Sequence, residues 1–574
     1  MTQRPPVTGV VGLGAVGEAL LRMLCASGHH VVGIDRDTEV LERVRRRTKT
    51  LEAGPAPTLT DDPAALDRAA LVIEAVPDVN ATKERVLRGL TGTCPDGTVL
   101  VTTTSALSVA RLAIASGRPA DLLALRFLAP PVPHCCVEQV RTSMTSPTAA
   151  RTLDRLVADL GLRSARVGAR PGADAVALVY GYLNRAVALC EQDYVGREDI
   201  DTAMRLGCGL PEGPLELLDR IGLDTAHTVL TDLHRRTGAA DLRPAALLTD
   251  LVAAGRLGRK KGAGFHTYDD LGRTERAPAG ADPDAAPPAP VRRVAVIGSG
   301  TMARGIAEVT AVAGLPTVLV ARSRAKGEAA LDTIGASLTR AVRRGRISVA
   351  TRTAANGLLS CAEHLSAVGD RDLVIEAIAE DITAKRSLFG TLGPLCAPGT
   401  LLATATSSLS VTECAAACGR GGQVLGMHFF NPAPDMRLVE LGRARDTTDE
   451  TVARARAFCA RLGKTAIVCP DRAGFIVNHL LFPYLGDAVR LLERHDTDIE
   501  EIDAAVEHGF GHPMGPFTLL DTIGLDIALA IQRRLHTAFG APGYAPSREL
   551  ELLVAAGRLG RKTGHGFRTA ARRS

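Results

Sequence analysis

The sequence of 574 residues contains no tryptophan and only 3% aromatic residues. No apolar run approaches the roughly 18–20 residues that a membrane-spanning helix needs. The net charge of +5 is mild and its carriers are dispersed, which argues against a nucleic-acid surface. The N-terminus lacks a basic segment followed by an apolar core and a cleavage site, so secretion is not expected. We therefore expect a cytoplasmic protein that binds neither nucleic acid nor membrane.

The twelve cysteines are scattered, with Cys135 and Cys136 adjacent and Cys414 four residues before Cys418. Neither arrangement has the spacing of a zinc site or a redox motif, so we expect reduced core residues and no metal. Apolar residues make up 46% and charged residues 23%, as in an ordinary globular protein. The chain is too long for one hydrophobic core and suggests about four compact units.

The most informative feature that is present is an internal duplication. From about residue 72 to 266, adding 302 to a position leads to its equivalent. ALVIEAVPDV at 70–79 thus corresponds to DLVIEAIAED at 372–381, and GRLGRKKGAGF at 255–265 to GRLGRKTGHGF at 557–567. One register held across many segments indicates that whole domains were duplicated.

Each copy begins with a strand, a glycine-rich turn, a helix and a second strand, which predicts a dinucleotide-binding fold of the Rossmann type. The turn residues are Gly12, Gly14 and Gly17 in the first copy and Gly298, Gly300 and Ala303 in the second. Long helical patterns follow, such as 474–493, whose apolar residues recur at three- and four-residue steps. The predicted fold class is therefore α/β, with two Rossmann-type domains, each followed by an all-α C-terminal domain.

The predicted domain organisation has five parts. They are a degenerate Rossmann-type domain at 1–170, a helical domain at 171–275, a Pro/Ala-rich linker at 276–290, a catalytic Rossmann-type domain at 291–472 and a helical domain at 473–574. The offset between the copies is 286 at the glycine-rich turns and 302 later, so the second copy carries sixteen additional residues. They fall within AALDTIGASLTRAVRRGRIS at 329–348, a basic segment with a helical pattern.

Three blocks of the second copy resemble the 3-hydroxyacyl-CoA dehydrogenase family. They are TSSL at 406–409, GMHFFNPAPDMRLVEL at 426–441 and DRAGFIVNHLL at 471–481. The resemblance implies hydride transfer between a nicotinamide cofactor and C3 of a 3-hydroxyacyl or 3-oxoacyl thioester. It also implies that His428 is the general base, a role that suits an imidazole because this group titrates near neutral pH. Glu440 matches the carboxylate that orients this base. Ser407 and Asn478 match residues that position the substrate.

The same resemblance assigns further contacts. Asn431 and the pair Glu380 and Lys385 match positions near the nicotinamide and ribose, with an exposed helical ion pair as the alternative for Glu380 and Lys385. The additional basic segment matches a helical arm over the active site. Within it Ser337 and Arg344 match contacts to coenzyme A, with a solvated basic helix face as the alternative. Ala405 departs from the family, which usually has Asn there.

The second strand of each copy ends differently. Asp35 ends it in the first copy, where a carboxylate accepts hydrogen bonds from the ribose and repels a 2′-phosphate, which favours NAD. In the second copy the segment 321–324 reads ARSR, and Arg322 and Ser323 could bind a 2′-phosphate. We therefore expect NADP(H) in the second copy, with NAD(H) as the alternative.

The first copy lacks the predicted base. Arg126 stands where the second copy has His428, and a guanidinium stays protonated, so we expect no turnover there. Ala129 and Val176 replace the two asparagines, whereas Ser105 and Glu138 are unchanged. We expect Glu138 to pair with Arg126. The glycines of this copy are compatible with bound NAD and also with a tight turn alone.

The leading hypothesis is a 3-hydroxyacyl-CoA dehydrogenase that works in the reductive direction on an acyl-CoA thioester. The alternative is a ketoreductase of specialised metabolism that acts on a carrier-bound 3-oxo substrate. A cofactor-binding structural or regulatory protein is the third hypothesis. The family's helical domains normally dimerise, so we expect an intramolecular pseudo-dimer, with a homodimer of chains as the alternative.

Overall fold

The computed structural model describes residues 7–49, 54–104, 107–127, 131, 136–167, 175–269, 274, 288–494 and 498–568. Of the predicted linker at 276–290, residues 276–287 lie outside the described residues. Two eight-stranded sheets are found in the described part of the chain, each followed by helices, so the predicted fold class is confirmed.

The first sheet has the order β3-β2-β1-β4-β5-β6-β7-β8 and is parallel except where β6 meets β7. Its strands are β1 (Val7–Val11), β2 (His30–Ile34), β3 (Thr58–Thr60), β4 (Ala69–Glu74), β5 (Val99–Thr102), β6 (Leu122–Phe127), β7 (Cys136–Val140) and β8 (Arg163–Val167). The helices between them are α1 (Ala15–Ala26), α2 (Thr38–Thr48), α3 (Asn80–Thr93), α4 (Val109–Ser116) and α5 (Pro147–Asp159). Val72 and Ile73 point to opposite faces and join separate apolar cores, because side chains alternate along a strand.

The second sheet repeats this order as β11-β10-β9-β12-β13-β14-β15-β16, with β14 and β15 antiparallel. Its strands are β9 (Val294–Ile297), β10 (Thr317–Val320), β11 (Leu359–Ala362), β12 (Leu373–Glu376), β13 (Leu401–Thr404), β14 (Val424–Phe429), β15 (Leu438–Arg443) and β16 (Thr465–Pro470). Its helices are α11 (Thr301–Val312), α12 (Arg324–Arg343), α13 (Val349–Leu358), α14 (Ile382–Leu395), α15 (Val411–Cys418) and α16 (Asp449–Arg461).

The sixteen additional residues of the second copy lie between β10 and β11. There α12, twenty residues long, and α13 form a helical arm, whereas the first copy has α2, eleven residues long, as the described helix between β2 and β3. The Ser323 hydroxyl accepts a hydrogen bond from the Lys326 N–H and so caps the arm where it begins.

Within the residues that the structure describes, five α-helices follow each sheet. They are α6 (Ala175–Glu191), α7 (Arg197–Cys208), α8 (Pro214–Ile221), α9 (Leu223–Thr237) and α10 (Ala246–Ala253) in the first copy, and α17 (Val477–Arg494), α18 (Ile499–Phe510), α19 (Pro516–Ile523), α20 (Leu525–Phe539) and α21 (Arg548–Ala555) in the second. The pattern at 474–493 predicted a helix from Gly474, but α17 begins at Val477. Positive φ angles at Gly474 (78°) and Phe475 (46°) keep these residues out of the helix.

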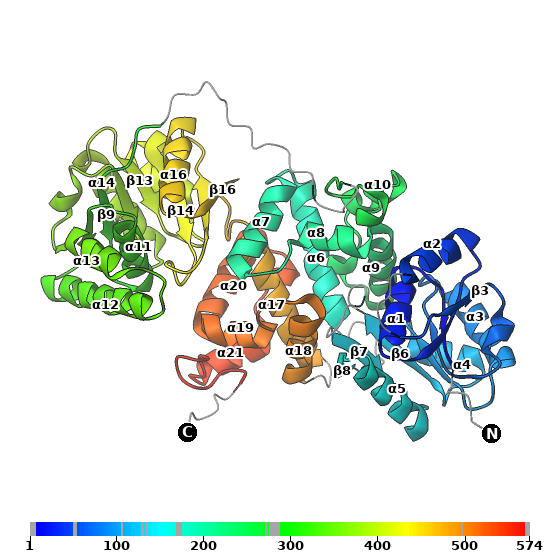
Figure 1. Cartoon of the computed structure of the whole chain (residues 1–574). Coiled ribbons are helices and arrows are strands. Elements are labelled where there is room, and N and C mark those ends of the chain that lie inside the picture. The colour runs from blue at the N-terminus through cyan, green and yellow to red at the C-terminus, as the bar shows by residue number, and fades with distance from the viewer. Residues whose placement is uncertain are drawn as a thin grey trace.

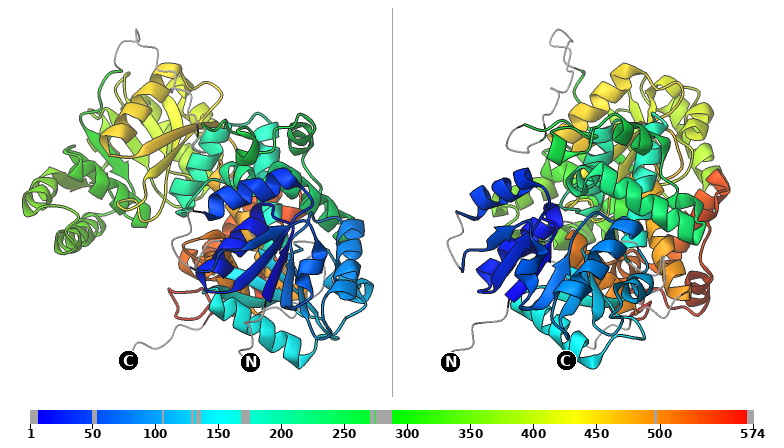
Figure 2. Two further views of the ribbon diagram at one scale, coloured as in Figure 1. Left: turned by 45° about the vertical axis from the view of Figure 1, so that its right-hand side comes forward. Right: turned by 90° about the vertical axis from the view of Figure 1, so that its right-hand side faces the viewer.

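The two helical domains lie together between the α/β domains (Figure 1). Helix α6 packs on α17, and each copy also contacts the sheet of the other: α18 lies against β7 and β8, and α7 against β15. Figure 2 shows the same arrangement from two further sides. Residues of both helical domains and of one face of the second sheet share a single apolar core. The two copies of one chain therefore contact each other as the predicted pseudo-dimer requires.

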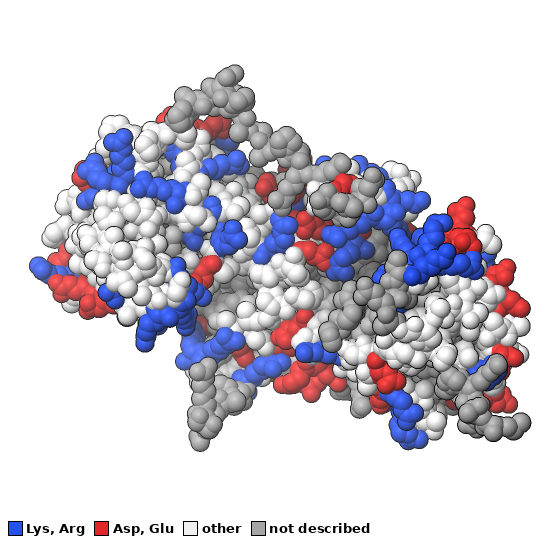
Figure 3. Space-filling view, viewed as in Figure 1, with Lys and Arg blue, Asp and Glu red and all other residues white. Residues whose placement is uncertain are grey.

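Charged side chains of both signs are mixed over the face shown in Figure 3. Basic side chains gather at α2, whose last turn contains Arg45, Arg46 and Arg47, and near the arm formed by α12. Within the described residues, no helix is both long and apolar enough to cross a membrane.

Candidate active site

His428 and Glu440 lie opposite each other on the antiparallel strands β14 and β15. The His428 Nδ1 is 2.8 Å from the Glu440 Oε2, and the Glu440 side chain is fully buried. The other oxygen, Oε1, accepts hydrogen bonds from the backbone N–H groups of Ile476 (3.0 Å) and Val477 (2.9 Å). Because Oε1 is occupied by the two backbone N–H groups, Oε2 can accept a hydrogen bond from Nδ1–H, which leaves Nε2 of the imidazole for proton transfer. This is the arrangement that a general base requires.

Aromatic rings and α17 complete the surroundings of the imidazole. The ring centroids of Phe430 and Phe475 lie 4.5 and 5.8 Å from that of His428. Asn478 is the second residue of α17 and is 7% exposed. Because Glu440 binds the start of α17 as well as His428, one carboxylate sets the relative position of the imidazole and the helix turn that carries the Asn478 amide.

Lys385 is buried, and the half-buried Glu380 lies before α14 and outside the helix, so the alternative of an exposed helical pair is wrong. Lys385 Nζ, 1% exposed, lies 3.3 Å from Glu380 Oε2 and donates to Glu376 Oε1 at 2.6 Å. Glu380 precedes α14 and accepts hydrogen bonds from the backbone N–H (3.0 Å) and hydroxyl (3.3 Å) of Ser407. Burial would raise the pKa of the Glu380 carboxyl, but the Lys385 charge and hydrogen bonds from Thr406 and Ser407 outweigh it and lower the pKa.

Arg534 on α20 contacts this network and was not among the predicted residues. Its guanidinium donates to the carbonyl oxygen of Glu380 (2.9 Å) and to the Ser408 hydroxyl (3.2 Å). It therefore connects the helical domain to the loops that carry Glu380 and Ser407. A signal was present in the repeat, because the first copy has Asp232 at the equivalent position.

The glycine-rich turns differ at their third position. In the first copy, a Cβ on Gly17 would lie 1.8 Å from the Gly12 carbonyl oxygen, so only glycine fits. In the second copy Gly298 has a φ of 131° instead of 90° at Gly12, and Ala303 is accommodated with its side chain fully buried.

Both turns could hold a dinucleotide. Gly14 and Gly300 are the N-caps of α1 and α11, neither helix start is capped by a side chain, and the space beside both glycines is open. Free N–H groups at a helix start bind phosphate, so both sites fit a pyrophosphate. In the first copy Asp35 Oδ2 also accepts the Leu13 N–H at 2.8 Å.

The segment 321–324, between β10 and α12, lies where the adenosine end of a dinucleotide would bind in the second copy. Arg322 is exposed, and the Ser323 hydroxyl caps α12. Arg324 forms an ion pair with Glu328 at 2.8 Å, and its N–H donates to the Glu363 carboxylate. Arg322 is therefore the cation of this segment that remains available, since neither a hydrogen bond nor an ion pair of its guanidinium occurs among the described residues.

A cavity of about 640 Å³ lies between α11, the arm and the segments 431–435 and 461–464. Ser337, Arg344 and Asn431 line it together, although they come from separate segments. The cationic side chains that line it are Arg304, Arg340, Arg344, Arg346, Arg461 and Lys464. Within the described residues the guanidinium groups of Arg340 and Arg344 have no hydrogen-bond or ion-pair partner. Six cationic side chains thus line the cavity against two carboxylates, Glu308 and Asp435, so it suits a phosphate-bearing ligand. The cavity also reaches Asn431, three residues after His428.

The first copy keeps the scaffold of this site without the base. Arg126 stands opposite Glu138 in the same strand register, and it is 1% exposed. Lys83 Nζ donates to Glu74 Oε1 at 2.8 Å, as Lys385 does to Glu376. Val176 is fully buried. The equivalents Ser105 and Ala129 lie outside the described residues.

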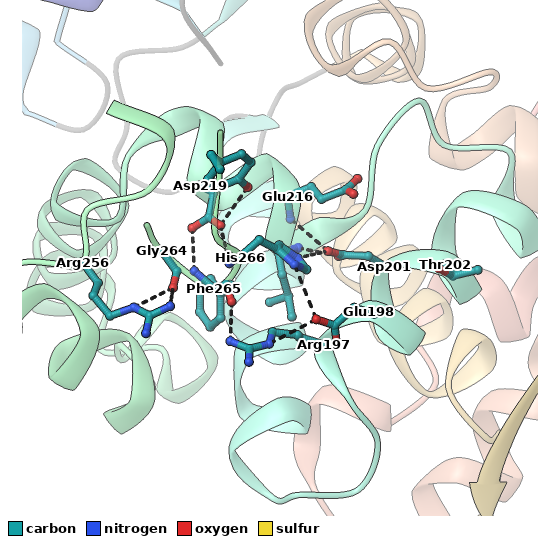
Figure 4. Close-up of polar contacts among 12 residues, drawn as sticks. Arg197, Glu198, Asp201, Thr202, Glu216, Asp219, Arg256, Gly264, Phe265 and His266 are labelled. Carbon is teal, nitrogen blue, oxygen red and sulfur yellow. Dashed lines mark hydrogen bonds and ion pairs between the residues drawn. The ribbon is translucent and has the colours of Figure 1, made fainter. Parts of the chain in front are cut away.

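A second buried histidine–carboxylate pair lies in the first helical domain (Figure 4). His266 Nε2 is 2.7 Å from Asp201 Oδ2, and Asp201 also accepts the Leu215 N–H (2.8 Å) at the start of α8. In the second copy Arg568 replaces this histidine and lies 2.9 Å from Asp503. Through Asp201, this pair connects the segment around His266 with α7 and with the start of α8, and Arg568 makes the equivalent contact to Asp503 in the second copy.

Metal and disulfide chemistry find no support in the described part of the chain. No group of three or more His, Cys, Asp or Glu residues is placed to hold a metal ion there, and the ten cysteines described are free thiols.

Two family profiles each match the chain twice. "3-hydroxyacyl-CoA dehydrogenase, NAD binding domain" matches residues 7–169 and 293–472, and "3-hydroxyacyl-CoA dehydrogenase, C-terminal domain" matches 175–268 and 474–570. These matches confirm the family resemblance and the duplication.

Similar proteins include a 3-hydroxybutyryl-CoA dehydrogenase of Mycobacterium tuberculosis, 42% identical over 49% of this chain and 98% of its own length. The mitochondrial hydroxyacyl-coenzyme A dehydrogenase of Mus musculus is 41% identical over 48% of this chain and 90% of its own length. A solved structure of 3-hydroxybutyryl-CoA dehydrogenase from Escherichia coli matches 96% of this chain and 99% of its own, with a TM-score of 0.64 and 20% identity. That structure shows that the whole two-copy fold has a solved counterpart.

Proposed function

We propose, from the premise that the chain belongs to the 3-hydroxyacyl-CoA dehydrogenase family, that its second copy transfers a hydride between a nicotinamide cofactor and C3 of a 3-hydroxyacyl-CoA or 3-oxoacyl-CoA. The observation that carries this proposal is the buried contact of 2.8 Å between His428 and Glu440. The first copy has Arg126 at the histidine position, so we propose one active site per chain.

His428 moves the proton in the proposed reaction. In the reductive direction its imidazolium donates the Nε2 proton to the carbonyl oxygen of the substrate, and Glu440 stabilises the imidazolium before the transfer. Ser407 and Asn478 position the reacting oxygen through a hydroxyl and an amide. The nicotinamide cofactor, when bound, provides the hydride for C3. Reaction in the oxidative direction uses Nε2 as the base, and the cofactor preference proposed below favours reduction.

The cofactor would bind with its pyrophosphate at the free N–H groups where α11 begins, beside Gly298, Gly300 and Ala303. We propose NADP(H) for the second copy, since Ala321 removes the carboxylate that repels a 2′-phosphate and the Arg322 guanidinium is available. The Glu363 carboxylate near the start of α12 acts against this preference. In the first copy Asp35 favours NAD, if a cofactor binds there.

The cationic cavity would hold the nucleotide end of coenzyme A, with Arg340 and Arg344 at its phosphates and Ser337 beside them. This favours a CoA thioester over the alternative, a carrier-bound 3-oxo substrate of specialised metabolism, because a carrier protein presents fewer phosphate charges. We further propose that the chain acts in the cytoplasm as an intramolecular pseudo-dimer, with a homodimer of chains as the alternative.

The proposal is tested by following NADPH and NADH oxidation with acetoacetyl-CoA for the wild type, His428→Ala and Arg126→Ala. Loss of a general acid–base group should lower kcat by roughly 10²–10⁴-fold in His428→Ala. Arg126→Ala, checked for folding by circular dichroism, should retain turnover. A wild-type chain that reduces no 3-oxoacyl thioester would sink the proposal, and loss of turnover in folded Arg126→Ala would overturn the single active site.

A further inference from the structure

Helix α7 of the first copy packs on the start of α17 and on β15 of the second copy, the two elements that flank the Glu440 carboxylate. The Cβ position of Gly207 lies 2.8 Å from Val477 Cγ2 and 3.1 Å from Leu438 Cδ2. Val477 is the first residue of α17, and Leu438 is the first residue of β15. A Cβ at this point of α7 would therefore force the Val477 side chain, and to a smaller extent that of Leu438, to move.

Both contacted residues belong to the segments that hold Glu440. The Val477 N–H donates to Glu440 Oε1 at 2.9 Å. Leu438 lies two positions before Glu440 in β15, so their side chains project to the same face of the sheet. The contact with Gly207 thus limits the movement of the helix start and of the strand between which the Glu440 carboxylate is held.

Other residues of the first copy strengthen this contact. The Tyr194 hydroxyl, in the segment before α7, donates to the Pro470 carbonyl oxygen at 2.9 Å, where β16 ends beside β15. Arg472 donates to the Gln192 side-chain oxygen at 3.0 Å and lies 5.0 Å from the centre of the Tyr194 ring. The pKa of the Cys208 thiol, next to Gly207, is raised to about 12 by burial and by the charge of Glu440. These contacts join α7 and the segment before it to β16 and to the residues between β16 and α17.

We propose that α7 of the first copy positions the His428–Glu440 pair of the second copy, and that Gly207 is a positioning residue for the reaction. The inactive copy then has a role in catalysis without binding substrate. This inference rests on the proposed function for its kinetic test, and one measurement below is independent of that function.

Gly207→Ala is the test variant, and Gly509→Ala, the equivalent change in α18, is its matched control. Alanine stabilises a helix interior by about 0.5–1 kcal/mol relative to glycine, so a loss of activity cannot come from a weaker α7. Gly207→Ala should displace Val477 and lower kcat about tenfold, while the KM for the cofactor stays nearly constant. Gly509→Ala should retain kcat, since α18 contacts the sheet of the inactive copy.

The pH profile separates positioning from general destabilisation. A displaced Glu440 stabilises the imidazolium less, so the alkaline limb of kcat for reduction should move to lower pH in Gly207→Ala. Adding Val477→Ala removes the methyl groups that the new Cβ meets. The double variant should therefore approach the kcat and pH profile of Val477→Ala alone.

Hydrogen–deuterium exchange of a peptide that covers 472–480 gives the measurement that does not depend on the substrate. The Val477 N–H should exchange faster in Gly207→Ala than in Gly509→Ala, because its bond to Glu440 weakens. Unchanged exchange in Gly207→Ala, or equal losses of kcat in both glycine variants, would overturn the inference. A wild-type chain inactive on all 3-oxoacyl thioesters would sink the proposed function but leave this exchange result interpretable.

Discussion

The two copies share a buried polar scaffold and differ in the residue at the position proposed to transfer the proton. Each has a buried lysine that donates to a strand glutamate, Lys83 to Glu74 and Lys385 to Glu376. Each has a glutamate on the antiparallel strand opposite the catalytic position, but that position holds Arg126 in one copy and His428 in the other. A preserved scaffold is therefore evidence for a fold and not for turnover.

The interface between the copies shows a second difference. Arg185 and Asp487 occupy equivalent positions, 302 residues apart, and form an ion pair with each other near the centre of the interface. Tyr182 and Tyr484 are likewise equivalent, with ring centroids 5.6 Å apart. If two first copies from different chains paired instead, Arg185 would face Arg185. If two second copies paired, Asp487 would face Asp487, so like charges would meet in both cases. The charges thus favour the pairing of unlike copies.

The largest effect is expected from reversing one charge of this pair. Arg185→Asp would place a third carboxylate beside Asp487 and Asp241, both of which now bind Arg185. Breaking a largely buried ion pair costs about 3–5 kcal/mol. The midpoint of thermal unfolding should therefore fall by about 10 °C at roughly 2–4 °C per kcal/mol.

Asp487→Arg is the partner variant in a double-mutant cycle. The chain with both reversals should recover part of the loss, because unlike charges again face each other. If the two single losses simply add in the double variant, the pair does not select the pairing of unlike copies.

A change at the cofactor end should have an effect of about tenfold. Arg322→Ala removes the guanidinium proposed to bind the 2′-phosphate, a loss worth about 1.5–3 kcal/mol for a hydrogen bond to a charged group. The KM for NADPH should rise at least tenfold while that for NADH changes little. Arg324→Ala, which removes a side chain already paired with Glu328, is the control. A wild-type preference for NADH would contradict the cofactor proposal.

The smallest effect concerns His266, where the second copy has Arg568. Burial lowers the pKa of His266, but its hydrogen bond to Asp201 and the charges of Asp201, Asp219 and Glu198 outweigh this and raise the pKa. A raised pKa means that this group stabilises the fold below its unfolded pKa of about 6.5, and that the stabilisation is lost as the pH rises through the folded pKa.

The unfolding midpoint of the wild type should therefore fall by about 2–4 °C, or roughly 1 kcal/mol, as the pH rises above about 6.5 through that window. His266→Arg, which introduces the residue of the second copy, should remove this dependence because a guanidinium stays charged. Differential scanning fluorimetry measures this change of the unfolding midpoint with pH. An equal change in the wild type and in His266→Arg would show that His266 does not cause it.

Sequence reasoning reached the fold and the pairing of His428 with Glu440 because both depend on local patterns. The strand and turn sequences predict the Rossmann-type domains, and the blocks around 428 and 440 resemble a known family. It was wrong in treating an exposed helical ion pair as an alternative for Glu380 and Lys385, since a spacing of five residues does not reveal burial. It also missed Arg534 and Gly207, whose partners lie more than a hundred residues away.

The amino-acid sequence by itself determined that the chain is a duplicated dehydrogenase fold, and that the second copy has His428 where the first copy has Arg126. Both follow from residue identity and register. Only the tertiary structure decided that Ser337, Arg344 and Asn431 share one cavity, and that Gly207 in α7 of the first copy lies against Leu438 and Val477 of the second. Such contacts depend on how distant segments pack, and packing across two copies leaves no periodic trace in either one.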